Sequence, residues 1–133
     1  MTNAPPQLTD VTALARNRHR ADLDNGMFLQ TLVADDIQDR LSMVNRDFKK
    51  IAVVTGFPKI WRDRFPEAII VPDTDVLDLT SQSHDLIIHA LALHWANDPV
   101  GQLIQCRRAL VEDGLLLTAS FGGQTLFELR SCL

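Results

Sequence analysis

Short apolar runs alternate along the chain with segments whose apolar residues recur every three or four positions. The apolar runs predict strands at 51–55, at 68–71, over a short 75–79, from Asp85 onward, and at 115–121. Most of these runs are apolar at successive rather than alternate positions. That pattern is typical of parallel strands that are covered on both faces.

The helical spacing predicts four helices between and after these strands. They are a long helix from Phe28, a short one over 59–65, one that begins at Asp98-Pro99 and ends near Gly114, and one from about Gln124. The segment 11–20 is compatible with a further short helix. Asp98 is a good N-cap, and proline suits the first turn that follows it.

The same spacing indicates which helical faces are buried. For the helix from Phe28, the expected buried face is Phe28, Leu29, Leu32, Val33, Ile37, Leu41 and Val44. For the helix from Pro99, it is Val100, Leu103, Ile104, Leu110 and Val111.

This order of elements predicts an α/β fold with a Rossmann-like, mostly parallel sheet of about five strands and helices on both faces. Residues 1–25 are polar and lack clear periodicity, so we interpret them as an N-terminal polar segment before a domain over 26–133. The chain is long enough for a single domain with a substantial core.

The run from Asp85 to Pro99 locates the expected site. It begins as a fully apolar strand, breaks into a turn that holds His94 and Trp95, and re-forms as a helix. In α/β sheets, ligands bind at the carboxyl ends of central parallel strands. His94 could act as a general base or, like Trp95, could anchor the loop through its ring nitrogens.

Three segments carry a resemblance to a known family. They are 85–98 with its Leu-His-Trp-Ala-Asn-Asp run, 105–114 with Asp113-Gly114, and 121–130 with its Phe-Gly-Gly-Gln-Thr-Leu run. From about Phe28 onward the chain resembles class I S-adenosylmethionine-dependent methyltransferases. Within that class it is most similar to the biotin-synthesis malonyl-carrier-protein methyltransferases and the respiratory complex I assembly factors.

The resemblance implies S-adenosylmethionine as cofactor, held by the loop after the first strand. Thr55 and Gly56 stand at this loop. Val54 occupies the place of the family's acidic residue, and Pro58 the place of its second glycine, with the bulky Phe57 between. Proline lacks an N–H and fixes φ. We therefore expect the methionine end of the cofactor pocket to be remodelled.

The resemblance assigns the remaining cofactor contacts to acidic residues and a histidine. Asp73 follows the second strand and would accept hydrogen bonds from the ribose, and Asp75 or Asp78 would lie beside the adenine amine. His89 ends the strand that lines the cofactor and substrate. Because aspartate is common in turns, simple loop solvation or capping is an equally good interpretation of these acids.

The sequence identifies neither a catalytic residue nor a metal site. His84, His89 and His94 lie five residues apart, which places alternate rings on opposite faces of a strand and argues against a shared ion. No Gly-x-Gly-x-x-Gly follows any strand, which disfavours a dinucleotide oxidoreductase.

Charge and composition restrict the partners. The net charge of −4 gives no reason to expect nucleic acid. The basic residues at 16, 18, 19 and 20 could contact an anionic group but are most simply interpreted as solvated. No apolar stretch reaches the roughly 18 residues that span a membrane. The start has no signal-peptide pattern. Two cysteines without metal-ligand spacing are typical of a reduced cytoplasmic protein.

Two functions remain open from the sequence. One is methyl transfer from S-adenosylmethionine to a small molecule or a protein-bound group. The other is a non-catalytic methyltransferase-fold domain that acts as a binding or assembly module. The family's sheet has two more strands after the last helix, whereas this sequence ends at Leu133. The exposed sheet edge predicts either a truncated chain or a homodimer that covers the edge.

Overall fold

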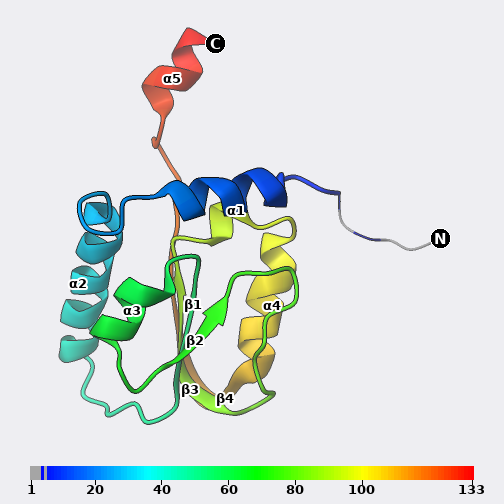
Figure 1. Ribbon diagram of the computed structural model, residues 1–133. Coiled ribbons are helices and arrows are strands. Elements are labelled where there is room, and N and C mark those ends of the chain that lie inside the picture. The colour runs from blue at the N-terminus through cyan, green and yellow to red at the C-terminus, as the bar shows by residue number, and fades with distance from the viewer. Residues whose placement is uncertain (1–3, 5) are drawn as a thin grey trace.

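Four parallel strands form one sheet in the computed structural model, which describes residue 4 and residues 6–133. The strands are β1 (Ile51–Thr55), β2 (Ile69–Pro72), β3 (His84–Ala90) and β4 (Leu110–Ala119), in the order β2-β1-β3-β4. All three neighbouring pairs are parallel. The α/β Rossmann-like architecture is therefore confirmed (Figure 1).

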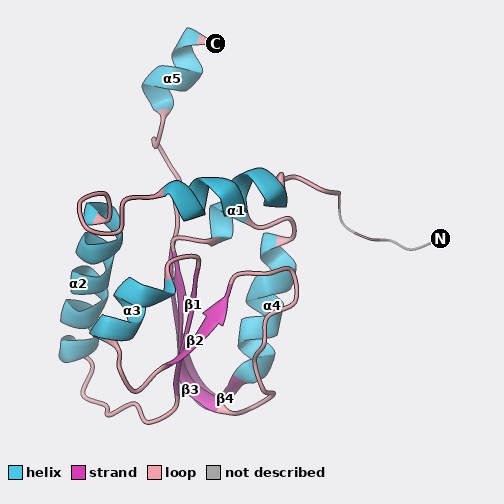
Figure 2. Ribbon diagram, viewed as in Figure 1, coloured by secondary structure: helices cyan, strands magenta, loops and turns pink. Residues whose placement is uncertain are grey.

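Helices cover both faces of the sheet (Figure 2). The helices are α1 (Val11–Arg20), α2 (Phe28–Met43), α3 (Pro58–Arg64), α4 (Pro99–Ala109) and α5 (Phe127–Cys132), with a 3-10 turn η1 (Leu93–Trp95). α2 and α3 lie on one face and α4 on the other. α1 lies across the carboxyl ends of the strands, and α5 extends away from the sheet (Figure 1).

Alternate side chains of the central strands build a core on each face. Val53, Leu86 and Ile88 pack with Trp61 of α3 and residues of α2. On the other face, Ala52, Val54 and Ile87 pack with Cys106 and Ala109 of α4. The continuous apolar runs in the sequence are thus explained, because both faces of β1 and β3 are buried.

The predicted strand over 75–79 is wrong, and the sheet has four strands rather than about five. This segment is a loop whose backbone bonds to side chains of α4 instead of to a strand. Gln105 Oε1 accepts from the Leu77 N–H at 2.7 Å, and Gln105 Nε2 donates to the Asp75 carbonyl at 2.9 Å. Leu77 is buried in the core, which explains its apolar character.

The predicted buried faces of the two long helices are also wrong in part. Phe28 and Leu32 of α2 are exposed, and the helix buries Gln30, Ala34 and Ile37. In α4, Val100 and Ile104 are exposed, whereas the buried residues are Gln102, Cys106 and Ala109. Polar residues occupy these buried positions because they satisfy buried donors and acceptors, which apolar periodicity does not reveal.

The boundary between α4 and β4 falls earlier than the sequence predicts. The helix ends at Ala109, and β4 begins at Leu110 instead of Leu115. The pairing of β3 with β4 shifts between His84 and Leu86, and Asp113 has a positive φ of 68°. Gly114 therefore lies inside an irregular stretch of the strand. Among the described residues, no strand pairs with the outer edge of β4.

Asp85 fixes the entry of the chain into the sheet. Its carboxylate accepts from the backbone N–H groups of Lys49 at 2.7 Å and Lys50 at 2.9 Å, directly before β1. Partial burial of Asp85 raises the pKa of its carboxyl, but these two bonds, together with its own backbone N–H and the charge of Arg46, lower the pKa overall. The charged form therefore stabilises the junction of β1 and β3.

We predict that Asp85→Ala lowers the free energy of unfolding by about 1 kcal/mol at neutral pH, because two charge-assisted but solvent-accessible bonds are lost. Since the folded-state pKa of Asp85 is lowered, its contribution is present above the unfolded value of about 3.9 and is lost as the pH falls through the folded value. Urea unfolding at neutral and acid pH measures both effects.

Asp39→Ala is the matched control, because Asp39 is an exposed aspartate of α2. A stability difference between Asp85→Ala and the wild type that does not shrink in acid would contradict this role of the carboxylate.

Candidate functional site

The N-terminal segment is anchored over the carboxyl ends of the strands by the loop after β3. Asn97 Oδ1 accepts from the N–H groups of Leu8 at 2.9 Å and Thr9 at 2.8 Å. The Thr9 hydroxyl donates to the Trp95 carbonyl at 2.7 Å. Asp10 then caps α1 by accepting from the Ala13 N–H at 2.9 Å. These bonds fix where α1 begins and direct it across the site.

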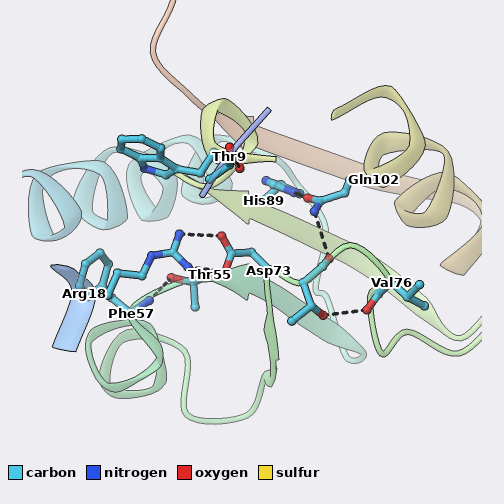
Figure 3. Close-up of polar contacts among 10 residues, drawn as sticks. Thr9, Arg18, Thr55, Phe57, Asp73, Val76, His89 and Gln102 are labelled. Atoms are coloured by element: carbon cyan, nitrogen blue, oxygen red, sulfur yellow. Dashed lines mark hydrogen bonds and ion pairs between the residues drawn. The ribbon is translucent and has the colours of Figure 1, made fainter. Parts of the chain in front are cut away.

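An ion pair joins α1 to the end of β2. The guanidinium of Arg18 donates to both carboxylate oxygens of Asp73, from Nη1 and Nη2, each at 2.7 Å. The two side chains are only 19% and 8% exposed. Figure 3 shows this two-point contact beside Phe57, whose ring centroid lies 6.0 Å from Arg18 Cζ. The interpretation of this basic run as solvated is therefore wrong for Arg18.

The loop after β1 lies directly under this guanidinium. Thr55 is buried, and its hydroxyl accepts from the Phe57 N–H at 3.0 Å, which holds the turn. A methyl group added to Gly56 would overlap the guanidinium of Arg18. Pro58 begins α3, where its missing N–H is not needed. The space that the glycine leaves open is thus filled by an arginine side chain.

Asp75 and His89 lie at the same end of the sheet but have different surroundings. Asp75 is exposed, and its Oδ1 accepts from Asn97 Nδ2 at 3.3 Å. His89 is fully buried, and its Nε2 lies 2.8 Å from Gln102 Oε1. Gln102 Nε2 donates to the Thr74 carbonyl at 3.1 Å, so the Gln102 oxygen is left to accept from the ring (Figure 3).

Burial lowers the pKa of His89, although Gln102 and the charge of Asp73 act in the opposite direction. A neutral ring that donates from Nε2 has a bare Nδ1, and this atom has no hydrogen-bond partner among the described residues. The structure therefore brings Gly56, Asp73, Asp75 and His89 together at the carboxyl ends of the strands, where Thr55 is the last residue of β1. It places His89 as a buried, neutral group.

Two cavities lie at the carboxyl ends of the strands, and both are lined by Arg18, Leu14 and Trp95. One, of about 360 Å³, lies between α1 and the loop after β2 and includes Asp73 and Asp75. The other, of about 270 Å³, lies over the ends of β1, β3 and β4 and includes Phe57 and Phe121.

His94 and Trp95 contribute aromatic surface to the smaller cavity. The His94 ring stacks on Phe121, with centroids 4.3 Å apart and planes inclined by 25°, and lies 5.2 Å from the Trp95 ring. Burial and the nearby Arg18 charge lower the pKa of His94, with Asp73 opposing. Both residues are held in the loop by packing, and a general-base role for His94 stays a hypothesis.

Other reactive side chains do not form a second site in the described part of the chain. No three residues among its histidines, cysteines, aspartates and glutamates are grouped to hold a metal ion. Burial raises the pKa of Cys106 to about 11, so its thiol stays protonated at neutral pH.

Three residues of this site have no role in the sequence-based prediction. Arg18 lies in the basic run of α1, and this run was the only signal for it. For Gln102, the available clue is an amide at a buried position of α4, whereas Asn97 lies in the loop just before that helix. Their partners are far away in sequence, so only the fold reveals the contacts.

The sequence matches one known protein family over most of its length. Residues 33–118 match a family described as a methyltransferase domain, which is more than half of the chain. The chain therefore belongs to the methyltransferase domain family. The resemblance in the sequence is confirmed. No solved structure is significantly similar to the chain.

The curated relatives include arginine-hydroxylases and malonyl-[acyl-carrier protein] O-methyltransferases. The chain is 37% identical over 68 residues to the mitochondrial arginine-hydroxylase NDUFAF5 of Danio rerio, covering 51% of this chain and 21% of that protein. The Mus musculus protein of that name is 40% identical over 68 residues, covering 51% and 20%. A malonyl-[acyl-carrier protein] O-methyltransferase of Laribacter hongkongensis is 43% identical over 63 residues, covering 47% and 21%.

The matched part of the chain thus spans about a fifth of the length of these relatives. Separately, none of the helices among the described residues has the length and apolar character needed to cross a membrane.

We predict that Asn97→Ala loosens α1 from the sheet, because the N–H groups of Leu8 and Thr9 lose their shared acceptor. Each lost bond contributes about 0.5–1.5 kcal/mol. Hydrogen exchange should therefore accelerate at the amides of α1 by about tenfold or more, while the amides of β1 and β3 stay unchanged. Asn25→Ala, an exposed asparagine before α2, is the control; equal exchange in both variants contradicts the anchoring role.

Proposed function

We propose that this chain is an S-adenosylmethionine-dependent methyltransferase-like domain with impaired cofactor binding, because its own first helix closes the cofactor site. The observation that carries the proposal is the two-point contact of Arg18 with Asp73 above Gly56. Family membership supports the methyltransferase part. Arg18 thus covers two of the expected cofactor contacts. Asp73 is the residue expected to bind the ribose, and Gly56 lies in the loop expected to hold the cofactor.

The residues as arranged do not fit the ribose end of S-adenosylmethionine. Both oxygens of Asp73 already accept from Arg18, and only 8% of the Asp73 side chain is exposed, so the ribose hydroxyls reach its remaining lone pairs only if Arg18 moves away. Breaking a largely buried ion pair costs about 3 kcal/mol, which corresponds to a loss of about a hundredfold in affinity. Arg18 also fills the approach to Gly56.

The methionine end fits no better. Val54 is fully buried and packs on the α4 side of the sheet, where it offers no carboxylate. Pro58 has no N–H to donate, and Phe57 stands where an approaching ligand needs bare backbone. These differences are part of the sequence and do not change when α1 moves.

The residues Val54, Phe57 and Pro58 also support a second candidate function, a non-catalytic methyltransferase-fold domain that acts as a binding or assembly module. The names of the relatives do not decide the matter. One group is named for hydroxylation of arginine and another for methyl transfer. Chemistry is set by the site and not by the fold.

Calorimetric titration with S-adenosylmethionine tests the proposal on three proteins: wild type, Arg18→Ala, and the matched control Arg16→Ala. Arg16 is an exposed arginine of the same helix. We expect weak or no binding by the wild type and by Arg16→Ala, and about a hundredfold gain for Arg18→Ala, because Asp73 and Gly56 become accessible.

Each outcome decides between the candidates. Tight binding by the wild type contradicts closure by Arg18. Failure of all three proteins to bind at millimolar cofactor, with amide spectra that show a folded Arg18→Ala, favours the non-catalytic module and assigns the loss to Val54, Phe57 and Pro58.

Further expectations follow from the sequence and stay proposals. The methyl acceptor is a small molecule or a protein-bound group. We propose a cytoplasmic location, because two cysteines without metal-ligand spacing are typical of a reducing compartment.

A homodimer is proposed through the outer edge of β4, because bare strand edges tend to pair. Sedimentation velocity at high concentration should show a dimer, which a charge introduced by Thr118→Lys on β4 weakens. A monomer at all concentrations contradicts this pairing.

A further inference from the structure

The smaller cavity beside Arg18 is a site that the proposed cofactor does not explain. It has a volume of about 270 Å³ and lies where α1, the start of α2 and the ends of β1, β3 and β4 converge. Known ligand pockets for drug-sized molecules begin at about 300 Å³, so this cavity suits a smaller molecule. It exists in the conformation in which Arg18 is paired with Asp73, because Arg18 forms one of its walls.

Four aromatic rings contribute to the remaining wall, beside the aliphatic Leu14, Leu29 and Leu91. Phe57, His94, Trp95 and Phe121 come from three different strand ends and all line the cavity. The stacked His94–Phe121 pair, at 4.3 Å, presents a flat surface held in place by the loops. Aromatic rings that meet such surfaces gain about 0.5–1.5 kcal/mol beyond area burial. A planar ring is therefore favoured over an aliphatic group of equal size.

Gln30 supplies an oriented hydrogen-bond donor. Its side chain lines the cavity and is only 9% exposed. Its Oε1 accepts from the Trp61 ring N–H at 2.9 Å, which fixes the amide with Nε2 as the remaining group. That Nε2 donates to no oxygen among the described residues. Nε2 is not fully buried, so it faces the open space of the cavity, where the acceptor of a ligand can bond to it.

Besides Gln30, the polar groups at the cavity are Asn17, Arg18 and His94, and they present no net positive charge. A guanidinium carries five N–H bonds and two of Arg18's point to Asp73, which leaves three. The Asp73 carboxylate neutralises the charge of Arg18 at contact distance. His94 has a lowered pKa, since burial and Arg18 disfavour its charged form, and so adds no charge at neutral pH. An uncharged acceptor matches this set better than an anion.

We infer that this cavity binds a small planar aromatic molecule that carries an uncharged carbonyl oxygen. The ring lies among Phe57, Trp95 and the His94–Phe121 pair, and the carbonyl accepts from Gln30 Nε2. The inference does not depend on cofactor binding, because the cavity is complete while Arg18 remains on Asp73.

The test uses benzamide as the probe and the folded wild-type chain without cofactor. Titration is followed by the NMR signals of the Trp95 indole N–H and of the Gln30 side-chain amide. We expect saturable shifts at both, with millimolar or tighter affinity. Cyclohexanecarboxamide keeps the carbonyl but lacks the flat ring, and benzoate keeps the ring but adds charge. Both should bind about tenfold more weakly.

Gln30→Glu is the decisive variant, because a carboxylate at this position still accepts from Trp61 but has no donor for the ligand. Benzamide affinity should fall by about tenfold, whereas Gln124→Glu, an exposed position before α5, should leave it unchanged. Trp95→Leu provides a second variant that removes one wall and should also weaken binding.

Absence of saturable shifts with benzamide overturns the inference. So does equal or tighter binding of benzoate or cyclohexanecarboxamide, or unchanged affinity in both Gln30→Glu and Trp95→Leu. Since S-adenosylmethionine is absent from this experiment, its failure leaves the closure by Arg18 untouched, and failure of the calorimetric test leaves this site untouched.

Discussion

The pairing of Arg18 with Asp73 is the interaction on which the functional end of this molecule depends. It joins a helix near the N-terminus to the end of an edge strand more than fifty residues away, through two bonds of 2.7 Å. Because both side chains are largely buried, neither can be removed without leaving a costly charge behind. The pair therefore determines which parts of the groove are open and which are filled.

Other contacts support this pair from the backbone. Asn97 holds the segment before α1, and Thr55 holds the turn beneath the guanidinium. Gly56 leaves the space that Arg18 occupies. In many α/β proteins, a glycine after the first strand lets a ligand approach the backbone. Here the same feature accommodates a side chain of the protein itself, and Arg18 lines both cavities beside it.

Buried polar residues explain why the sequence pattern predicts the main strands correctly but predicts the buried faces of α2 and α4 only in part. Ile51–Thr55 was predicted with its observed bounds, because continuous apolar runs are characteristic of covered parallel strands. The faces of α2 and α4 were misjudged because Gln30 and Gln102 are buried to serve Trp61 and His89. The segment 75–79 has three apolar residues, as a short strand would, yet Gln105 satisfies its backbone as a loop.

The sequence by itself determined the layered α/β architecture, the family, and the edge of the sheet where a site lies. Local periodicity and the motif runs carry this information, because each depends on residues close together in the chain. Only the tertiary structure decided what occupies that edge. Arg18, Asn97 and Gln102 act through partners far away in sequence. Whether an arginine is solvated or buried against an aspartate depends on how α1 crosses the strand ends.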